Sequence, residues 1–149
     1  MSRPTYETQS DSDRERLVVE SMAIAWGLNP IKLPKFYKQD WALAKLDKTV
    51  RAIVEVKCRT HERGRFDTLI LSLDKWQALA MLSERTSTKG LLGVRYSDGI
   101  YWIVAQHQPE WKITIGGRTD RADPDDVEPV IHIPSSQLRP LFTNGHPTV

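Results

Sequence analysis

The stretch that decides the fold is QDWALAKLDKTVRAIVEVKCR, residues 39–59. Its pattern predicts two short strands joined by a tight turn at Asp47-Lys48. If the turn is centred between these two residues, opposed residues have numbers that sum to 95, which places Asp40 opposite Glu55. The predicted hairpin therefore brings two carboxylates together.

Two carboxylates at opposed positions predict a bound cation between them. Opposed Cβ atoms lie about 4.5–5.5 Å apart, and like charges at that separation destabilise a sheet. Mg²⁺ is commonly held by one or two carboxylates together with phosphate oxygens and water. Side chains alternate along a strand, so Lys57 projects from the same face as Glu55 and can contact a phosphate or the attacking water. The pattern favours a metal site for phosphodiester chemistry.

An alternative interpretation is that Asp40, Glu55 and Lys57 are the solvated face of an ordinary antiparallel hairpin. Ordinary surface pairing avoids placing two acids opposite each other. Ile53 also lies on the same face as Glu55, so that face is not wholly polar. These two points favour a site over a plain surface.

An acidic residue on one strand and Glu-x-Lys on the next, after a helix that bears a glutamate, resembles the PD-(D/E)xK nuclease superfamily. The matching residues are Glu20, Asp40, Glu55 and Lys57, and the resemblance spans roughly residues 13–105. It implies an α/β (α+β) fold with a restriction-endonuclease-like αβββαβ core. In such a core a mixed central sheet is flanked by helices, and this chain would add extra C-terminal strands.

The resemblance also implies a chemistry. Asp40, Glu55, Lys57 and Glu20 would be the catalytic residues, and the metal ligands would be Asp40, Glu55, Glu20 and the backbone carbonyl of Val56. The cofactor would be Mg²⁺, for which Mn²⁺ can substitute, and the substrate would be DNA. Many members of the superfamily pair as homodimers to cut two strands.

The chain departs from the superfamily pattern at two places. Gln39, not proline, precedes Asp40. In the helix after the motif, Gln77 is followed four residues later by Met81, so the Gln-x-x-x-Tyr of the exonuclease branch is absent. The subfamily is therefore left open, with an endonuclease as the favoured activity.

Basic residues cluster around the proposed site. Residues 28–66 carry ten Lys and Arg against four acids, a local charge of +6, although the net charge of the chain is only +2. A polyanion would be attracted to such a region. We expect nucleic-acid contacts from the basic residues near the motif, which are Arg59, Arg63, Arg65 and Lys75. A generic charged surface is the alternative for each of them.

Composition bounds the class of protein. A chain of 149 residues with 40% apolar residues suits one domain, here expected over 13–142, with a flexible arm at 1–12 and a flexible tail at 143–149. The single cysteine, Cys58, excludes an internal disulfide and is compatible with a reducing cytoplasm. The sequence contains no apolar run near 18 residues and no nucleotide-binding glycine loop. We therefore expect a cytoplasmic protein that has DNA as its partner, no membrane association and no nucleotide cofactor.

The remaining elements follow from periodicity and turn residues. A first helix is predicted over 13–26, with Ser12 as its N-cap and an apolar stripe of Leu17, Ser21, Ile24 and Leu28. The two prolines in 29–34 predict an irregular connection. Gly90 is expected to end the second helix. The other predicted elements are a strand at 68–71, a helix at 74–85, a hairpin of 91–96 with 100–106, strands at 111–115 and 130–133, and a helical turn at 135–141.

The function favoured by the sequence is a metal-dependent nuclease that hydrolyses DNA phosphodiester bonds. The alternative is a non-catalytic protein that retains the nuclease fold for nucleic-acid binding or assembly. The intact set of Asp40, Glu55 and Lys57 argues against lost chemistry, because a degenerate site usually drops one of its members.

Overall fold

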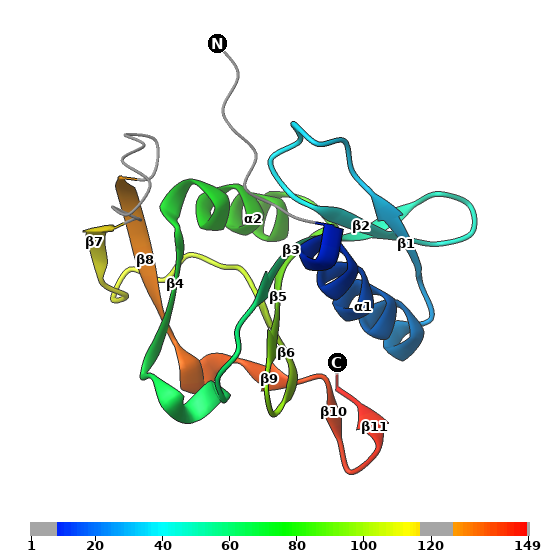
Figure 1. The fold of residues 1–149 in the computed structure, drawn as a ribbon. Coiled ribbons are helices and arrows are strands. Elements are labelled where there is room, and N and C mark those ends of the chain that lie inside the picture. The colour runs from blue at the N-terminus through cyan, green and yellow to red at the C-terminus, as the bar shows by residue number, and fades with distance from the viewer. Residues whose placement is uncertain (1–8, 117–126, 149) are drawn as a thin grey trace.

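The computed structural model describes residues 9–116 and 127–148. The first helix is followed by four strands, and the described elements after the second helix are strands and one 3-10 turn (Figure 1). In chain order the elements are α1 (Gln9–Trp26), β1 (Asn29–Lys32), β2 (Trp41–Ala44), β3 (Val50–Cys58), the 3-10 turn η1 (Arg63–Arg65), β4 (Thr68–Ser72), α2 (Leu73–Arg85), β5 (Lys89–Tyr96), β6 (Gly99–Val104), β7 (Ile113–Gly116), β8 (Glu128–Pro134), the 3-10 turn η3 (Ser135–Gln137), β9 (Arg139–Pro140), β10 (Phe142–Thr143) and β11 (His146–Pro147).

A mixed six-stranded sheet forms the centre of the molecule. Its strand order is β1-β2-β3-β5-β6-β9, in which β3 and β5 are parallel and the other neighbours are antiparallel. The helices α1 and α2 cover opposite faces of this sheet (Figure 1). A three-stranded sheet, β4-β8-β7, packs beside α2. The predicted mixed α/β core with extra C-terminal strands is therefore present.

The register of the β2–β3 hairpin is as predicted where it matters for the motif. Trp41 pairs with Val54 and Ala42 with Ile53, so the numbers of opposed residues sum to 95. Nearer the turn the register shifts at a bulge, and Ala44 pairs with Val50 instead of Arg51. The turn is longer than expected, because Lys45 N–H donates to the carbonyl of Thr49.

The third strand of the core differs from the prediction. The predicted strand at 68–71 is β4, but it pairs with β8 in the second sheet. The third strand of the central sheet is instead β1. It lies in the segment 29–34, which we expected to be irregular. Proline is tolerated on an edge strand, and Pro30 lies at the edge of the sheet. The αβββαβ order holds with β1, β2 and β3 as its three strands.

The first helix differs in its start and in its buried face. It begins at Gln9, so Ser12 lies inside it and is not its N-cap. The residues that face the sheet are Val18, Val19, Met22 and Ala23, which are at most 4% exposed. The predicted stripe is wrong, since Leu17 and Ile24 are 55% and 81% exposed.

Gly90 has a different role from the predicted helix stop. It lies inside β5, after the helix has ended at Arg85. A Cβ atom at this position would collide with the backbone of Leu79. The glycine therefore lets the middle of α2 approach β5 closely.

The C-terminal region is more regular than expected. Residues 142–147 form the small hairpin β10–β11, although we expected a flexible tail from residue 143 onward. The side chains of Trp26 and Trp102 both donate hydrogen bonds to Thr148, at 2.7 Å. The predicted arm at 1–12 falls mostly outside the described residues. Within the described residues no helix is long and apolar enough to cross a membrane.

Candidate active site

The hairpin brings Asp40 beside the middle of β3. The backbone N–H of Asp40 donates to the carbonyl of Val54 at 3.3 Å, which continues the pairing beyond Trp41. The Asp40 carboxylate then accepts a hydrogen bond from the Val56 N–H, with 3.1 Å between Oδ2 and N. The predicted juxtaposition of residues 40 and 55 follows, because Glu55 lies between these two contacts.

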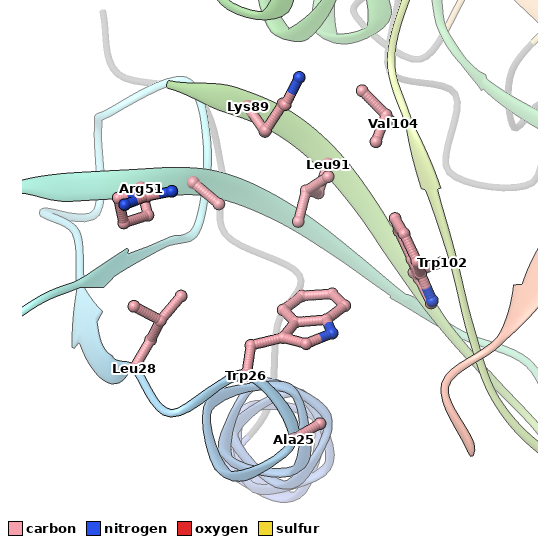
Figure 2. A pocket seen from close by; sticks show the side chains of 9 residues that line it. Ala25, Trp26, Leu28, Arg51, Lys89, Leu91, Trp102 and Val104 are labelled. Atoms are coloured by element: carbon pink, nitrogen blue, oxygen red, sulfur yellow. The ribbon is translucent and has the colours of Figure 1, made fainter. Parts of the chain in front are cut away.

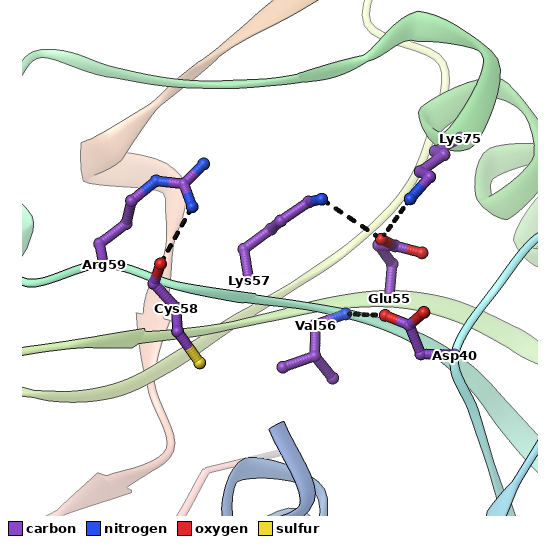
Figure 3. A network of polar contacts seen from close by, with 7 residues as sticks. All are labelled: Asp40, Glu55, Val56, Lys57, Cys58, Arg59 and Lys75. Carbon is purple, nitrogen blue, oxygen red and sulfur yellow. Dashed lines mark hydrogen bonds and ion pairs between the residues drawn. The ribbon is translucent and has the colours of Figure 1, made fainter. Parts of the chain in front are cut away.

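Glu55 is the buried centre of a polar network (Figure 3). Its side chain is 1% exposed and projects from β3 towards α2. Its Oε2 atom lies 2.9 Å from Lys75 Nζ and 3.6 Å from Lys57 Nζ. Its Oε1 atom is buried and has no hydrogen-bond partner among the described residues. One oxygen is thus neutralised by lysines, and the other can accept a further ligand.

The electrostatics of the site follow from burial and from the neighbouring charges. Burial raises the pKa of Glu55, the charge of Asp40 raises it further, and Lys57 and Lys75 oppose the rise. Burial lowers the pKa of Lys75, but the charge and hydrogen bond of Glu55 outweigh this and leave it raised. The site therefore holds two neighbouring carboxylates whose repulsion is opposed by two lysines, and a bound cation would oppose it further.

The residues present fit a hard divalent cation. Carboxylate oxygens are the ligands that Mg²⁺ prefers, and the free Oε1 of Glu55 supplies one beside the Asp40 carboxylate. Within the described parts of the chain, no group of three or more His, Cys, Asp and Glu is arranged to hold a metal. The site thus offers a carboxylate pair, and other ligands would come from a backbone carbonyl, water or phosphate.

The contribution of α1 differs from the sequence expectation. Glu20 is half-buried, and the structure does not gather it with Asp40 and Glu55 into a three-carboxylate metal group. Another α1 carboxylate, Glu15, lies close enough to the end of β3 to raise the pKa of Cys58, after the larger effect of burial.

The structure places the four predicted nucleic-acid contacts in different surroundings. Arg63 is used inside the fold: its guanidinium donates to the carbonyl oxygens of Leu138 and Ser135, at 3.1 and 3.4 Å. Arg65 is exposed on the short turn η1. Lys75, expected to face DNA, instead pairs with Glu55. No local sequence signal indicates this pair, because it forms only when α2 packs against β3.

Arg59 belongs to a second basic group that the sequence did not indicate. It lines a cleft of about 580 Å³ at the carboxyl ends of β3 and β5, together with Arg14 and Arg95. Parallel pairing makes Arg95 the neighbour of Cys58. Three arginines from separate parts of the chain thus line one cleft at this end of the sheet, just beyond the motif.

An apolar cavity lies on the opposite face of the sheet (Figure 2). It encloses about 580 Å³ between α1 and the strands, and its walls include Trp26, Leu91 and Trp102. The charged residues at its edge are Arg51 and Lys89, and no carboxylate lines it. This cavity lacks the groups that phosphodiester chemistry needs, so it is separate from the site around Glu55.

Comparisons with known proteins give one family and one similar structure. Residues 1–141 match the family described as "Phage putative PDDEXK endonuclease". The crystal structure of Hjc from Archaeoglobus fulgidus, a Holliday junction resolvase of an archaeal hyperthermophile, is similar with a TM-score of 0.49. It is 16% identical in sequence, over 83% of this chain and 85% of that chain. A search of curated proteins found no match.

Proposed function

The chain belongs to the phage PDDEXK endonuclease family, and on this premise we propose that Asp40, Glu55 and Lys57 form its metal-dependent active site. Membership makes the chain a nuclease that acts on DNA. The proposal adds the residues and the cofactor: Mg²⁺, or Mn²⁺ in its place, held by the two carboxylates.

One observation carries the assignment of the site. Glu55 is 1% exposed, and its Oε1 atom has no partner within the described residues, although the charge of Asp40 is close enough to raise the pKa of Glu55. A buried ionised carboxylate is costly unless its oxygens are bound. A chain that needed only a stable hairpin would be better served here by an apolar residue. The arrangement is explained if a cation completes it.

Each residue then has a distinct task. When bound, the ion polarises the phosphate and lowers the pKa of a bound water. Asp40 and Glu55 hold it, and the carbonyl of Val56 is a further candidate ligand. The Asp40 carboxylate is itself fixed by the Val56 N–H, so the ligand is oriented before DNA arrives. Lys57, 30% exposed at the open side, orients the water or neutralises charge on the phosphate.

Lys75 supports the site in a way that differs from the predicted DNA contact. Its ammonium group lies 2.9 Å from Glu55 Oε2 and comes from the first turn of α2. It holds the Glu55 carboxylate in one orientation, with Oε1 left for the ion. We assign Lys75 a positioning role towards Glu55. Glu20 remains a candidate outer ligand, but it is not grouped with Asp40 and Glu55 within the described residues.

Two further parts of the proposal rest on the sequence: a cytoplasmic location and a homodimer. A homodimer would present two active sites to the two strands of a DNA duplex. Sedimentation of the purified protein, with and without DNA, would give the number of chains in the particle.

Cleavage of supercoiled plasmid DNA in a Mg²⁺ titration tests the proposed site. Asp40→Ala and Glu55→Ala should abolish metal-dependent cleavage while circular dichroism shows both variants to be folded. Glu110→Gln, which removes an exposed carboxylate between β6 and β7, is the matched control and should cut normally. Cleavage that survives in both folded alanine variants would remove this site from the reaction.

A further inference from the structure

The loop between β1 and β2 presents two aromatic rings to solvent beside the site. Phe36 and Tyr37 are 81% and 56% exposed, and they follow each other in the chain. Most other aromatic side chains of the described residues are buried or half-buried. Adjacent exposed rings mark an interaction surface more strongly than scattered apolar residues do.

The charges around these rings indicate a polyanionic partner. Residues 28–39 contain three lysines and no acid. Lys35 lies with its Nζ atom 5.6 Å from the centre of the Phe36 ring. Lys38, which follows Tyr37 in the chain, is 63% exposed and forms a solvent-exposed ion pair with Asp74 at 3.5 Å. Protein interfaces are generally depleted of lysine. Aromatic rings between lysines instead suit single-stranded nucleic acid, whose bases stack while its phosphates are neutralised.

The loop is anchored at the active site. Its base is closed by a hydrogen bond from the Leu33 N–H to the carbonyl of Asp40, at 3.0 Å. A turn within the loop is fixed by the Tyr37 N–H, which donates to the carbonyl of Pro34 at 2.9 Å. The exposed rings are thus three and four residues from a proposed metal ligand. A nucleotide stacked on them would belong to the same strand as a phosphate at the site.

A cleft between this loop and α2 adds a place for a base. It encloses about 520 Å³ and is lined on the loop side by Tyr37, Lys38 and Gln39. Its helix side includes Gln77, Arg85 and Asp74, and the Asp74 carboxylate is paired with Lys38. Gln39 is 5% exposed, and its Nε2 atom is buried with no hydrogen-bond partner among the described residues. A buried amide donor without a partner is costly. A nucleobase in the cleft offers carbonyl and ring-nitrogen acceptors that would satisfy it once the amide turns toward the cleft.

We propose that the loop 34–39 and the adjoining cleft bind an unpaired nucleotide next to the scissile phosphate, with Phe36 and Tyr37 as stacking surfaces and Gln39 as a hydrogen-bond donor. The preferred substrate is then DNA with a single-stranded or locally opened segment, since paired bases within a duplex cannot stack on these rings. This inference rests on the proposed function, because it concerns DNA at the same site. It also gives Gln39, where the superfamily pattern has proline, a role of its own.

Binding measured without metal tests this inference apart from catalysis. The probes are a fluorescent single-stranded oligonucleotide and the blunt duplex of the same sequence, titrated in EDTA and followed by fluorescence anisotropy. Phe36→Ala/Tyr37→Ala should weaken single-strand affinity about fivefold or more, as expected from the loss of base stacking. Duplex affinity should change by less than about twofold. Ile24→Ala is the matched control, because Ile24 on α1 is also 81% exposed.

Gln39→Leu separates binding from folding. It removes the unpartnered amide nitrogen while nearly keeping the volume, so the free energy of unfolding should stay the same or rise. Its single-strand affinity should nevertheless fall. A 2-aminopurine base placed in the single-stranded probe should change its fluorescence on binding to wild type, and should change less with the double variant.

Three results would overturn the inference. The first is an equal loss of affinity for both DNA forms in the double variant. The second is unchanged single-strand affinity in the folded double variant. The third is a shift from dimer to monomer in sedimentation with DNA binding intact, which would make the loop a protein interface. A wild-type protein that selects single strands but cleaves no DNA would overturn the proposed function and leave this inference standing.

Discussion

The two faces of β3 have the same strand geometry but opposite chemistry. Towards α2 the strand presents Glu55 and Lys57, which form an ion pair with each other (Figure 3). Glu55 also forms an ion pair with Lys75 of α2. Towards α1 it presents Val54 and Val56, which are at most 1% exposed within an apolar cluster. Burial of the apolar face stabilises the fold, and this offsets the electrostatic cost of burying charged groups on the other face. One strand therefore serves as both the scaffold and the site.

The largest contrast is expected between two neighbouring residues, Lys57 and Cys58. Lys57→Ala should slow metal-dependent cleavage about 10²–10³-fold, as for other groups that stabilise charge in a transition state. Cys58→Ala, on the other face, should cut within about twofold of wild type. Initial rates on a labelled DNA at saturating metal make the comparison. Similar losses in the two variants would show that the two faces are not divided by function.

Val56→Ala is the converse change, on the structural face. It removes buried methyl groups at a position 1% exposed, so we expect a loss of roughly 1–3 kcal/mol in the free energy of unfolding. The backbone N–H that fixes Asp40 remains, and metal affinity should not change. Urea denaturation gives the stability, and calorimetry gives the metal affinity. A folded variant with much weaker metal binding would mean that packing towards α1 sets the geometry of the site.

The arginines after β3 extend the comparison beyond the strand. Arg63→Ala should lower stability by about 1–2 kcal/mol, because two carbonyl oxygens lose a charged donor. Arg59→Ala/Arg65→Ala should leave stability nearly unchanged but reduce the slope of log affinity for DNA against log salt by about 1–2. Anisotropy at several salt concentrations measures that slope. If Arg63→Ala alone flattens it without loss of stability, our division of these residues is wrong.

The smallest expected effect concerns Asp40 without metal. A raised pKa means that the folded protein binds the Glu55 proton more tightly than the unfolded chain does. This stabilisation is complete below the ordinary value of 4.5 and is lost as the pH rises through the raised value of the folded state. Asp40→Asn removes one cause of the rise and keeps an acceptor oxygen for Val56.

Asp40→Asn should therefore be more stable than wild type above that pH, by roughly 0.2–1 kcal/mol. The difference should shrink as the pH falls to that of an ordinary glutamate. Urea denaturation in EDTA at several pH values measures it. Parallel stability curves for the two proteins would show that Asp40 and Glu55 are not coupled.

Local sequence signals were sufficient for the hairpin and the motif. Alternation and the turn predicted the pairing of residues 41–43 with 52–54, and this fixed the position of Asp40 relative to Glu55. These features depend on contacts near in sequence, where the strand period leaves few alternatives. The bulge near the turn was missed because it does not disturb the alternation further along.

Features that depend on distant contacts were not predictable in the same way. The prolines in 29–34 predicted an irregular segment instead of β1. Proline is compatible with a strand there because β1 lies at the edge of the sheet, and that position depends on the whole sheet. The strand β4 could not be assigned to the second sheet, because its partner β8 lies about sixty residues away. The ion pair of Lys75 with Glu55 and the buried amide of Gln39 likewise require α2 to be in place.

Titration of the purified protein with Mn²⁺ by calorimetry tests the central claim most directly, because it measures the carboxylate pair without DNA. The wild-type protein and the Glu110→Gln control should show the same saturable binding, and Glu55→Gln should lose it. Added Mn²⁺ should accordingly raise the melting temperature of the first two proteins only. Unchanged Mn²⁺ affinity in folded Glu55→Gln, or no saturable binding by wild type, would contradict a metal centre on this face of β3.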